Sequence, residues 1–402
     1  MGGSRHIVSD TRFCLPHSVS CPAVSGALPV AHLHLMFRSR RSVSARQLWR
    51  QRCIVPSRGQ GEGAPPSPED LQNALRPAAH QLFKKLKDEQ LWQLAEALES
   101  KGSWECGCVY LPWDSRSGKQ PPQVLLCKLY RWPDLRHGAE LKRLIQCESF
   151  WRKSGEGTSL CCNPYHFSRL AAPDSTSPLS IKAREIARTF LADNPIAHSV
   201  QRGKISSIRG CQDTTLSRSN TRDGYWCKLA YWEHRTRVGR LYNVSESSVH
   251  IFHDLPKGSG FCLGYLHSET RNEMVRRTRK KIGQGLTLSY EQDGVWVYNR
   301  SDHPIFVNSP TLAPMSGRGQ SVYKVLPGYS IKVFEQGVSM SSYTYLGDGP
   351  CDPHSVRISF AKGWGSSYSR QFITSCPCWL EILLCPPRYP RDESIFPRNR
   401  VL

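Results

Sequence analysis

The spacing of apolar positions changes part-way along the chain, and this change separates helical regions from strand-like ones. Between residues 67 and 102, leucines recur at intervals of three to five residues, which predicts two amphipathic helices meeting near Asp88. Pro77 breaks or restarts the first of these helices. Two short apolar runs, residues 108–111 and 124–130, then predict strands on either side of a turn-rich stretch.

The region from residue 225 to 384 is dominated by short runs of aromatic and β-branched residues. Turn signals such as Asp293-Gly294 and Pro327-Gly328 separate these runs, and strands at this spacing are typical of a β-sandwich. The runs are residues 229–232, 249–252, 295–298, 305–307 and 330–334. Within this region, residues 269–282 carry the pattern most typical of a helix.

Polar segments divide the chain into predicted domains. Residues 173–224 are polar, and only residues 181–191 are patterned as a helix, so a mobile linker is expected there. The predicted parts are a disordered basic arm (1–66), an α+β N-terminal domain (67–172), the linker (173–224), a β-sandwich C-terminal domain with flanking helices and loops (225–385) and a tail (386–402).

Charge narrows the classes of partner. The 402 residues include 54 lysines and arginines against 33 acidic residues, a formal net charge of +21. Such a surplus favours an acidic partner, either nucleic acid, an anionic membrane or a phosphoprotein. No run of 18 apolar residues occurs, so no membrane span is expected. Residues 36–58 hold seven arginines and no acid, typical of a disordered arm or of a nucleic-acid or nuclear-import patch.

The meaning of the sixteen cysteines depends on the compartment. Polar residues and prolines interrupt every short apolar stretch of residues 1–35, so no secretory signal is predicted and a reducing compartment is expected. In that setting, clustered Cys and His residues are more readily metal ligands than disulfides. Four residues separate Cys161 from His166, and Cys147 and Cys108 lie upstream. These four match a Cys₃His zinc set, and the alternative is buried thiols beside a hydrogen-bonded histidine.

Several long strings of the sequence resemble the two Mad-homology domains of SMAD proteins. Residues 129–135 (LYRWPDL) and 161–170 (CCNPYHFSRL) resemble the N-terminal domain. The strings that resemble the C-terminal domain are residues 231–240, 254–262, 360–365 and 375–379. The string HRTRVG at residues 234–239 and the arginine-rich start at Met36 resemble the inhibitory branch of the family.

The resemblance implies one structural Zn²⁺ ion. Its ligands would be Cys108, Cys147, Cys161 and His166, with Cys106 as a neighbouring competitor for Cys108. Four protein ligands leave no open position for water, so the role would be structural. No glycine elbow, Walker loop or zincin helix occurs in the sequence, and an enzyme is not expected.

DNA-binding members of this family insert a basic β-hairpin into the major groove. The matching segment here, residues 113–122, is shorter, and Pro121 and Pro122 remove two backbone donors from any hairpin ladder. Arg116, Lys119 and Gln120 remain able to touch DNA. The sequence therefore favours weak, non-specific electrostatic binding of DNA over sequence-specific readout.

Basic side chains of the C-terminal region are candidates for phosphate binding. By themselves Lys332, Lys362, Tyr368 and Arg370 are typical of a solvated surface, but the resemblance implies that they line a pocket for phosphoserine. A second basic cluster lies at the C-terminal end of the predicted helix. Some of its side chains would interact favourably with the helix dipole, and others would extend an anion-binding surface. Its members are Arg276, Arg277, Arg279, Lys280 and Lys281.

The resemblance implies an antagonist of TGF-β/BMP signalling, in nucleus and cytoplasm, that binds activated type I receptors or other SMADs. Residues 396–402 lack the Ser-x-Ser tail through which receptor kinases activate SMADs, so such activation is not expected. The alternative is a zinc-bearing, DNA-binding transcription regulator or corepressor in the nucleus.

A WW-domain motif stands in an unexpected place. Inhibitory SMADs carry Pro-Pro-x-Tyr in the linker, whereas here it occurs in the tail, at Pro386, Pro387 and Tyr389. The tail motif is either a ligand for a HECT-type ubiquitin ligase or a chance match in a proline-rich segment.

Overall fold

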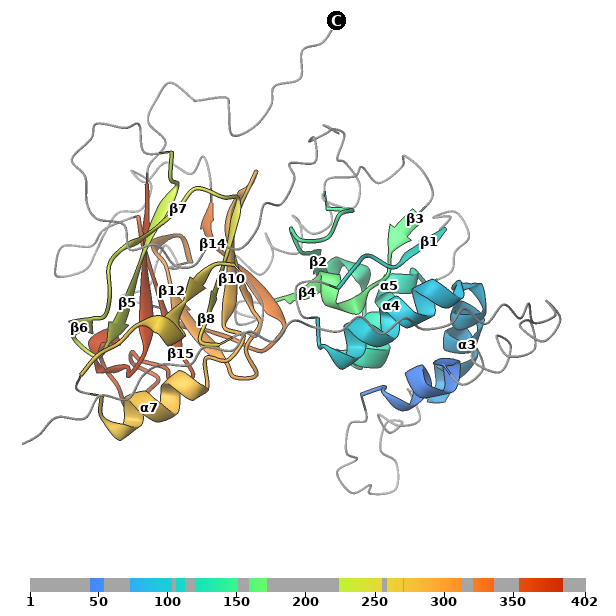
Figure 1. Ribbon diagram of the computed structural model, residues 1–402, viewed down its shortest axis with the longest axis horizontal. Coiled ribbons are helices and arrows are strands. Elements are labelled where there is room, and N and C mark those ends of the chain that lie inside the picture. Colours follow the sequence, from blue (N-terminus) through green and yellow to red (C-terminus); the bar gives the residue numbers. More distant parts are fainter. Residues whose placement is uncertain are drawn as a thin grey trace, which may run out of the picture.

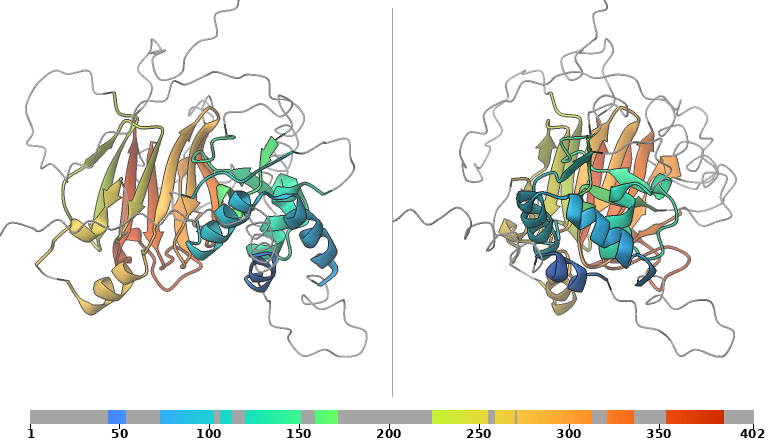
Figure 2. Two further views of the ribbon diagram at one scale, coloured as in Figure 1. Left: turned by 45° about the vertical axis from the view of Figure 1, so that its right-hand side comes forward. Right: turned by 90° about the vertical axis from the view of Figure 1, so that its right-hand side faces the viewer.

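The computed structural model describes residues 44–53, 73–102, 106–112, 120–150, 159–171, 224–254, 259–269, 271–312, 321–335 and 354–385. A helix-rich N-terminal part, coloured blue to green, lies beside a two-sheet C-terminal part, coloured yellow to red (Figures 1 and 2). No helix in the described part of the chain is long and apolar enough to cross a membrane.

The helix pair expected around Asp88 is confirmed. Helix α3 (Arg76–Lys85) has Pro77 in its first turn, where the missing backbone N–H has no helical partner to lose. Helix α4 (Asp88–Glu99) begins with two acidic residues that favour its positive end, and the Gln90 side chain accepts a hydrogen bond from the Lys87 backbone N–H at 2.8 Å. The leucines of both helices lie in one apolar core.

The strand predicted over residues 124–130 is wrong, because this run is helix α5 (Pro122–Tyr130). The helix is buried on nearly all sides, from Val124 through Leu129 to Tyr130, so its sequence shows no helical period. A short apolar run without period suits a buried strand or a buried helix equally, and Pro122 at the first turn is the signal that favours the helix.

Part of the predicted disordered arm is folded. Residues 44–50 form a helix, and Leu48 is fully buried in the core of the N-terminal part. The Tyr130 hydroxyl donates to the Leu48 carbonyl at 3.0 Å, and the backbone N–H of Cys53 donates to the Leu129 carbonyl at 2.8 Å. The rest of the arm, the linker up to residue 223 and the tail from residue 386 lie outside the described residues.

Among its described residues, the N-terminal part also has four short strands. They are β1 (Tyr110–Pro112), β2 (Leu141–Arg143), β3 (Ser159–Cys161) and β4 (Phe167–Leu170). Strands β1 and β3 pair antiparallel, and β2 pairs antiparallel with β4. The strand expected over residues 108–111 therefore exists, shifted by two residues to β1.

The predicted β-sandwich is confirmed, and all five expected runs are strands. Its strands are β5 (Cys227–Glu233), β6 (Thr236–Arg237), β7 (Tyr242–Val244), β8 (Ser248–Phe252), β9 (Phe261–Cys262), β10 (Leu286–Glu291), β11 (Gly294–Asn299), β12 (Ile305–Asn308), β13 (Tyr323–Val325), β14 (Tyr329–Glu335), β15 (Ser355–Phe360) and β16 (Trp379–Leu384). Val, Ile and Leu side chains from both sheets form one continuous core between them.

The two sheets differ in which parts of the chain supply their strands. One has the order β13-β12-β15-β16-β5-β6, with β7 also paired to β5. The other has the order β2-β4-β14-β11-β10-β8-β9, so it begins with two strands of the N-terminal part. Helix α7 (Glu273–Lys280) confirms the helix predicted within residues 269–282, and the Asn272 side chain caps it by accepting from the Val275 N–H at 2.9 Å.

Candidate metal centre and phosphate-binding surface

Short turns and strand ends place the four candidate metal ligands. Cys108 stands just before β1, and Cys161 ends β3 directly opposite Tyr110 of that strand. His166 ends the 3-10 turn η3 (Pro164–His166), which the Asn163 side chain caps. The turn after β2 brings in Cys147.

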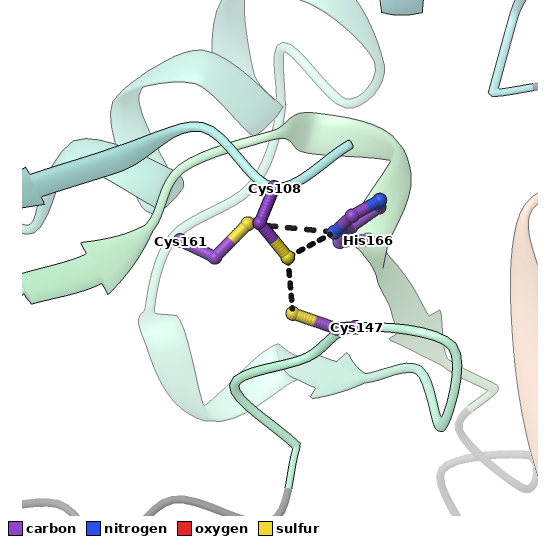
Figure 3. Close-up of side chains that lie close together, drawn as sticks. All are labelled: Cys108, Cys147, Cys161 and His166. Carbon is purple, nitrogen blue, oxygen red and sulfur yellow. Dashed lines mark hydrogen bonds between the residues drawn. The ribbon is translucent and has the colours of Figure 1, made fainter. Parts of the chain in front are cut away.

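The ligand atoms of Cys108, Cys147, Cys161 and His166 all lie within 4.8 Å of one another (Figure 3). The Cys108 and Cys147 sulfurs are 3.7 Å apart, and His166 Nδ1 lies 3.3 Å from Cys108 Sγ and 3.4 Å from Cys161 Sγ. A zinc tetrahedron with ordinary bond lengths has S–S edges of about 3.8 Å and S–N edges of about 3.5 Å. The cluster is thus the right size for one zinc ion.

The orientation of His166 decides between the two neighbouring cysteines. Its Nε2 lies 3.0 Å from the backbone carbonyl oxygen of Cys106, so that nitrogen carries the proton and Nδ1 faces the sulfurs. The Cys106 sulfur lies 3.8 Å from Nε2, on the far side of the ring from the cluster. Cys162 is buried and donates to the Val109 carbonyl at 3.2 Å. The geometry therefore selects Cys108 and Cys161.

The protonation of each side chain in the cluster depends on that of its neighbours. Hydrogen bonds from Cys147 and Cys161, with help from His166, hold the pKa of Cys108 far below its ordinary value. The pKa of Cys161 is raised, because it shares hydrogen bonds with Cys108 and Cys147 and is buried. Burial opposes charge on His166, yet its sulfur neighbours raise its pKa to about 12. Such a site favours a cation that can replace these protons.

Three of the four predicted phosphate-binding residues lie in one loop. Lys362, Tyr368 and Arg370 follow β15, and the Arg370 carbonyl accepts from the Gly365 N–H at 2.7 Å. The Tyr368 ring covers Gly363, where an added Cβ would lie 2.5 Å from the ring. The loop is therefore fixed by its own backbone and by the fit of the tyrosine on glycine.

Lys332, the fourth predicted residue, lies elsewhere. It is in β14, which belongs to the other sheet from β15. Its ammonium pairs with Asp293 at 2.6 Å and lies 5.4 Å from the centre of the Trp296 ring. The structure thus groups Lys362, Tyr368 and Arg370, while the assignment of all four to phosphate binding stays a prediction.

Helix α7 borders the same loop. The Arg370 guanidinium lies 3.9 Å from the Met274 sulfur, and Arg276, Arg277 and Lys280 are exposed while Lys281 is half-buried. The basic loop therefore contacts a helix that also carries exposed basic side chains.

Arg279 requires a correction. It was expected in the anion surface, but its side chain is 7% exposed and is paired with the buried Glu233 at 2.9 Å. The side chain points into the sandwich because the helix turns position 279 to the same face as the buried Val275.

Comparison with known proteins decides the family. A model of the MH1 domain matches residues 75–171, and a model of the MH2 domain matches residues 224–385. Mothers against decapentaplegic homolog 6 of Gallus gallus is 50% identical over 337 residues, covering 78% of this chain and 76% of its own length. The chain belongs to the SMAD family. Mothers against decapentaplegic homolog 7 of Homo sapiens, 43% identical over 77% of this chain and 78% of its own length, also places this SMAD in the inhibitory branch.

Sequence reasoning missed a central residue of this SMAD, Arg131. Its guanidinium lies 4.1 Å from the Trp132 ring centre and 5.0 Å from that of Tyr165. It donates to the carbonyls of Pro164, at 3.0 Å, and Phe167. Its position directly before Trp132 gave no hint of this role, because every partner but Trp132 is distant in sequence.

Proposed function

We propose that this inhibitory SMAD antagonises TGF-β/BMP signalling by binding phosphorylated type I receptors, or other SMADs, through its C-terminal domain. The observation that carries the proposal is the contact between the loop that holds Lys362 and Arg370 and helix α7, which carries exposed basic side chains of its own. Occupying a phosphorylated partner without passing on its signal is an inhibitory act.

The chemistry of this surface suits a phosphate group. A phosphoserine carries a charge of roughly −1.5 to −2 and three strong acceptor oxygens, which guanidinium and ammonium donors satisfy by charge-assisted bonds. Among the described residues no carboxylate forms an ion pair with Lys362 or Arg370. A fixed loop also binds at a smaller entropic cost than a mobile one.

In the N-terminal domain, Zn²⁺ would be structural. Cys108, Cys147, Cys161 and His166 would hold it, and a closed set of four ligands leaves no position for a substrate. The ion would tie the end of β3 and the turn η3 to the segment before β1 and to the turn after β2.

Sequence-specific DNA binding is not favoured. Residues 113–119, with Arg116 and Lys119, lie outside the described residues, but Pro122 already begins α5, so the segment leads into a helix. Weak electrostatic DNA binding follows from the net charge of +21. The proposal includes a HECT-type ligase that binds Pro386, Pro387 and Tyr389, which lie outside the described residues. It also places the protein in both nucleus and cytoplasm.

The test is the affinity of the full chain for a type I receptor juxtamembrane segment, phosphorylated and unphosphorylated. Lys362→Ala and Arg370→Ala should each weaken binding of the phosphorylated form about tenfold, since a charge-assisted bond contributes about 1.5–3 kcal/mol. Lys324→Ala, which removes an exposed lysine from β13, is the matched control. Equal binding by the wild type and the Lys362/Arg370 double variant would refute the proposed surface.

A further inference from the structure

The two domains are joined through one β-sheet. Strand β4 pairs in parallel with β14, and the N–H groups of Arg169 and Ala171 donate to the carbonyls of Gly328 at 3.2 Å and Ser330 at 2.9 Å. The buried hydroxyl of Ser330 donates to that of Ser168 at 2.8 Å. The N-terminal domain therefore covers an edge of the sandwich that would otherwise have unpaired backbone groups.

A buried ion pair reinforces this contact. Lys142 of β2 donates to both carboxylate oxygens of Glu291 in β10, at 2.6 and 2.8 Å, and the two side chains are 13% and 9% exposed. The Lys142 ammonium also lies 4.6 Å from the centre of the Trp296 ring. We call the β4–β14 pairing and the Lys142–Glu291 pair the interdomain clasp. Opening the clasp leaves each of these two charges without its partner.

The clasp begins where the metal centre ends. His166 is the last residue of η3, and Phe167, the next residue, is the first of β4. Arg131 binds both sides of this junction through the carbonyls of Pro164 and Phe167, and it also donates to the Tyr298 hydroxyl of β11 at 3.2 Å. One guanidinium thus touches the ligand-bearing turn, the clasp strand and the sandwich.

We propose that metal occupancy of the Cys₃His centre holds the interdomain clasp closed, and that loss of the metal releases the N-terminal domain from β14. Four residues make up β4, and the position of its first residue is set by a metal ligand. A site that is ordered only with its metal transmits that order to the strand that follows it. This inference rests on the proposed zinc site and is independent of receptor binding.

Release of the clasp changes the surroundings of Lys332. This side chain, 17% exposed, shares the Trp296 ring with Lys142, so the N-terminal domain and Lys332 meet on one aromatic surface. Metal loss therefore exposes a lysine that the family resemblance assigns to phosphate binding.

Covalent lysine labelling of the full chain, read by mass spectrometry, tests the inference. With zinc bound, Lys332 should label slowly, and after chelation its labelling should rise about tenfold, the scale of ordinary coupling between sites. Lys324, exposed in β13, should label equally in both states. Lys142→Met, which opens the clasp without altering a ligand, should label rapidly at Lys332 with or without zinc.

The reverse measurement keeps the test independent of any single variant. Because coupling between two events is reciprocal, Lys142→Met should weaken zinc affinity by the same factor, and the charge exchange Lys142→Glu with Glu291→Lys should restore it. Competition with a chromophoric chelator measures the zinc affinity of both variants. A chain that binds zinc but shows unchanged Lys332 labelling on chelation overturns this inference alone. A chain that binds no zinc overturns the metal assignment, and the inference with it.

Discussion

Two arginines of helix α7, two positions apart, are predicted to have opposite roles. Arg279 donates to buried Glu233 at 2.9 Å and to the Leu263 carbonyl at 2.6 Å. Arg277 pairs with Glu273 on the helix surface, and their side chains are 76% and 61% exposed. Methionine has nearly the helix propensity of arginine, so Arg279→Met and Arg277→Met differ only in the contacts that they remove.

The expected loss of folding stability in Arg279→Met depends on the partners that Glu233 keeps. Removing one partner of a buried ion pair costs about 3–5 kcal/mol, because the other charge stays buried. Glu233 keeps Arg271, whose Nε lies 2.9 and 3.0 Å from its two oxygens, so the lower figure of about 3 kcal/mol applies. Arg277→Met should leave stability unchanged within error, since exposed pairs often contribute nothing measurable.

Urea titration of the full chain measures the difference, followed by hydrogen exchange of strand β5, which contains Glu233. With a slope of about 2 kcal/mol per molar urea, Arg279→Met should lower the midpoint by about 1.5 M. Binding to the phosphorylated receptor segment should show the reverse order, with Arg277→Met the weaker binder. Equal midpoints for the two variants would refute the assignment of Arg279 to the interior.

Three further predictions concern the metal, pH and the tail. Cys161→Ala should lose bound zinc in metal analysis while Cys162→Ala retains it, because the Cys162 thiol donates to the Val109 carbonyl outside the cluster. Burial, then the charge of Arg300, lowers the pKa of His250 from 6.5 to about 4, so the unfolded chain binds a proton in that window that the folded chain does not. Stability should therefore fall by roughly 3 kcal/mol as pH falls from 6.5 to 4, and His250→Gln should flatten this part of the denaturation profile. A peptide of residues 384–394 should bind a WW domain with a Kd on the order of micromolar and lose binding on Tyr389→Ala; equal weak binding by both peptides would remove the ligase from the proposal.

Local patterns predicted the sandwich well. Runs such as residues 295–298 and 330–334 combine β-branched and aromatic residues with adjacent turn signals, and both are strands in the structure. The four candidate ligand side chains, which the structure brings together, could be named from their residue types and spacing combined with the family resemblance. In each case the physical requirement leaves a mark in the sequence itself.

The failures share a different cause. The apolar run at residues 124–130 does not distinguish a helix from a strand, because a segment buried on nearly all sides shows no hydrophobic periodicity. Arg279 belongs to the same run of basic residues as its exposed neighbours. Its burial needs both the helix face that it shares with Val275 and the partner Glu233 on β5, which is distant in sequence. The arginine-rich segment around Leu48 was expected to be disordered. In the structure, buried Leu48, a hydrogen bond from the Tyr130 hydroxyl and a backbone hydrogen bond from Cys53 to Leu129 hold it against α5.

The interdomain clasp is the extreme case of this cause, and it shows why family resemblance alone is insufficient. Ser168 and Ser330 are 162 positions apart, and a serine in a strand carries no sign of a partner in another domain. Lys142 and Glu291 are equally ordinary until the β4–β14 pairing brings them together and removes water from both. Lys142 and Glu291 become partners only after the strands pair. The backbone pairing must therefore be known before the side-chain contacts can be assigned. A sequence comparison that treats the two domains as separate units therefore omits the contact through which one of them can control the other.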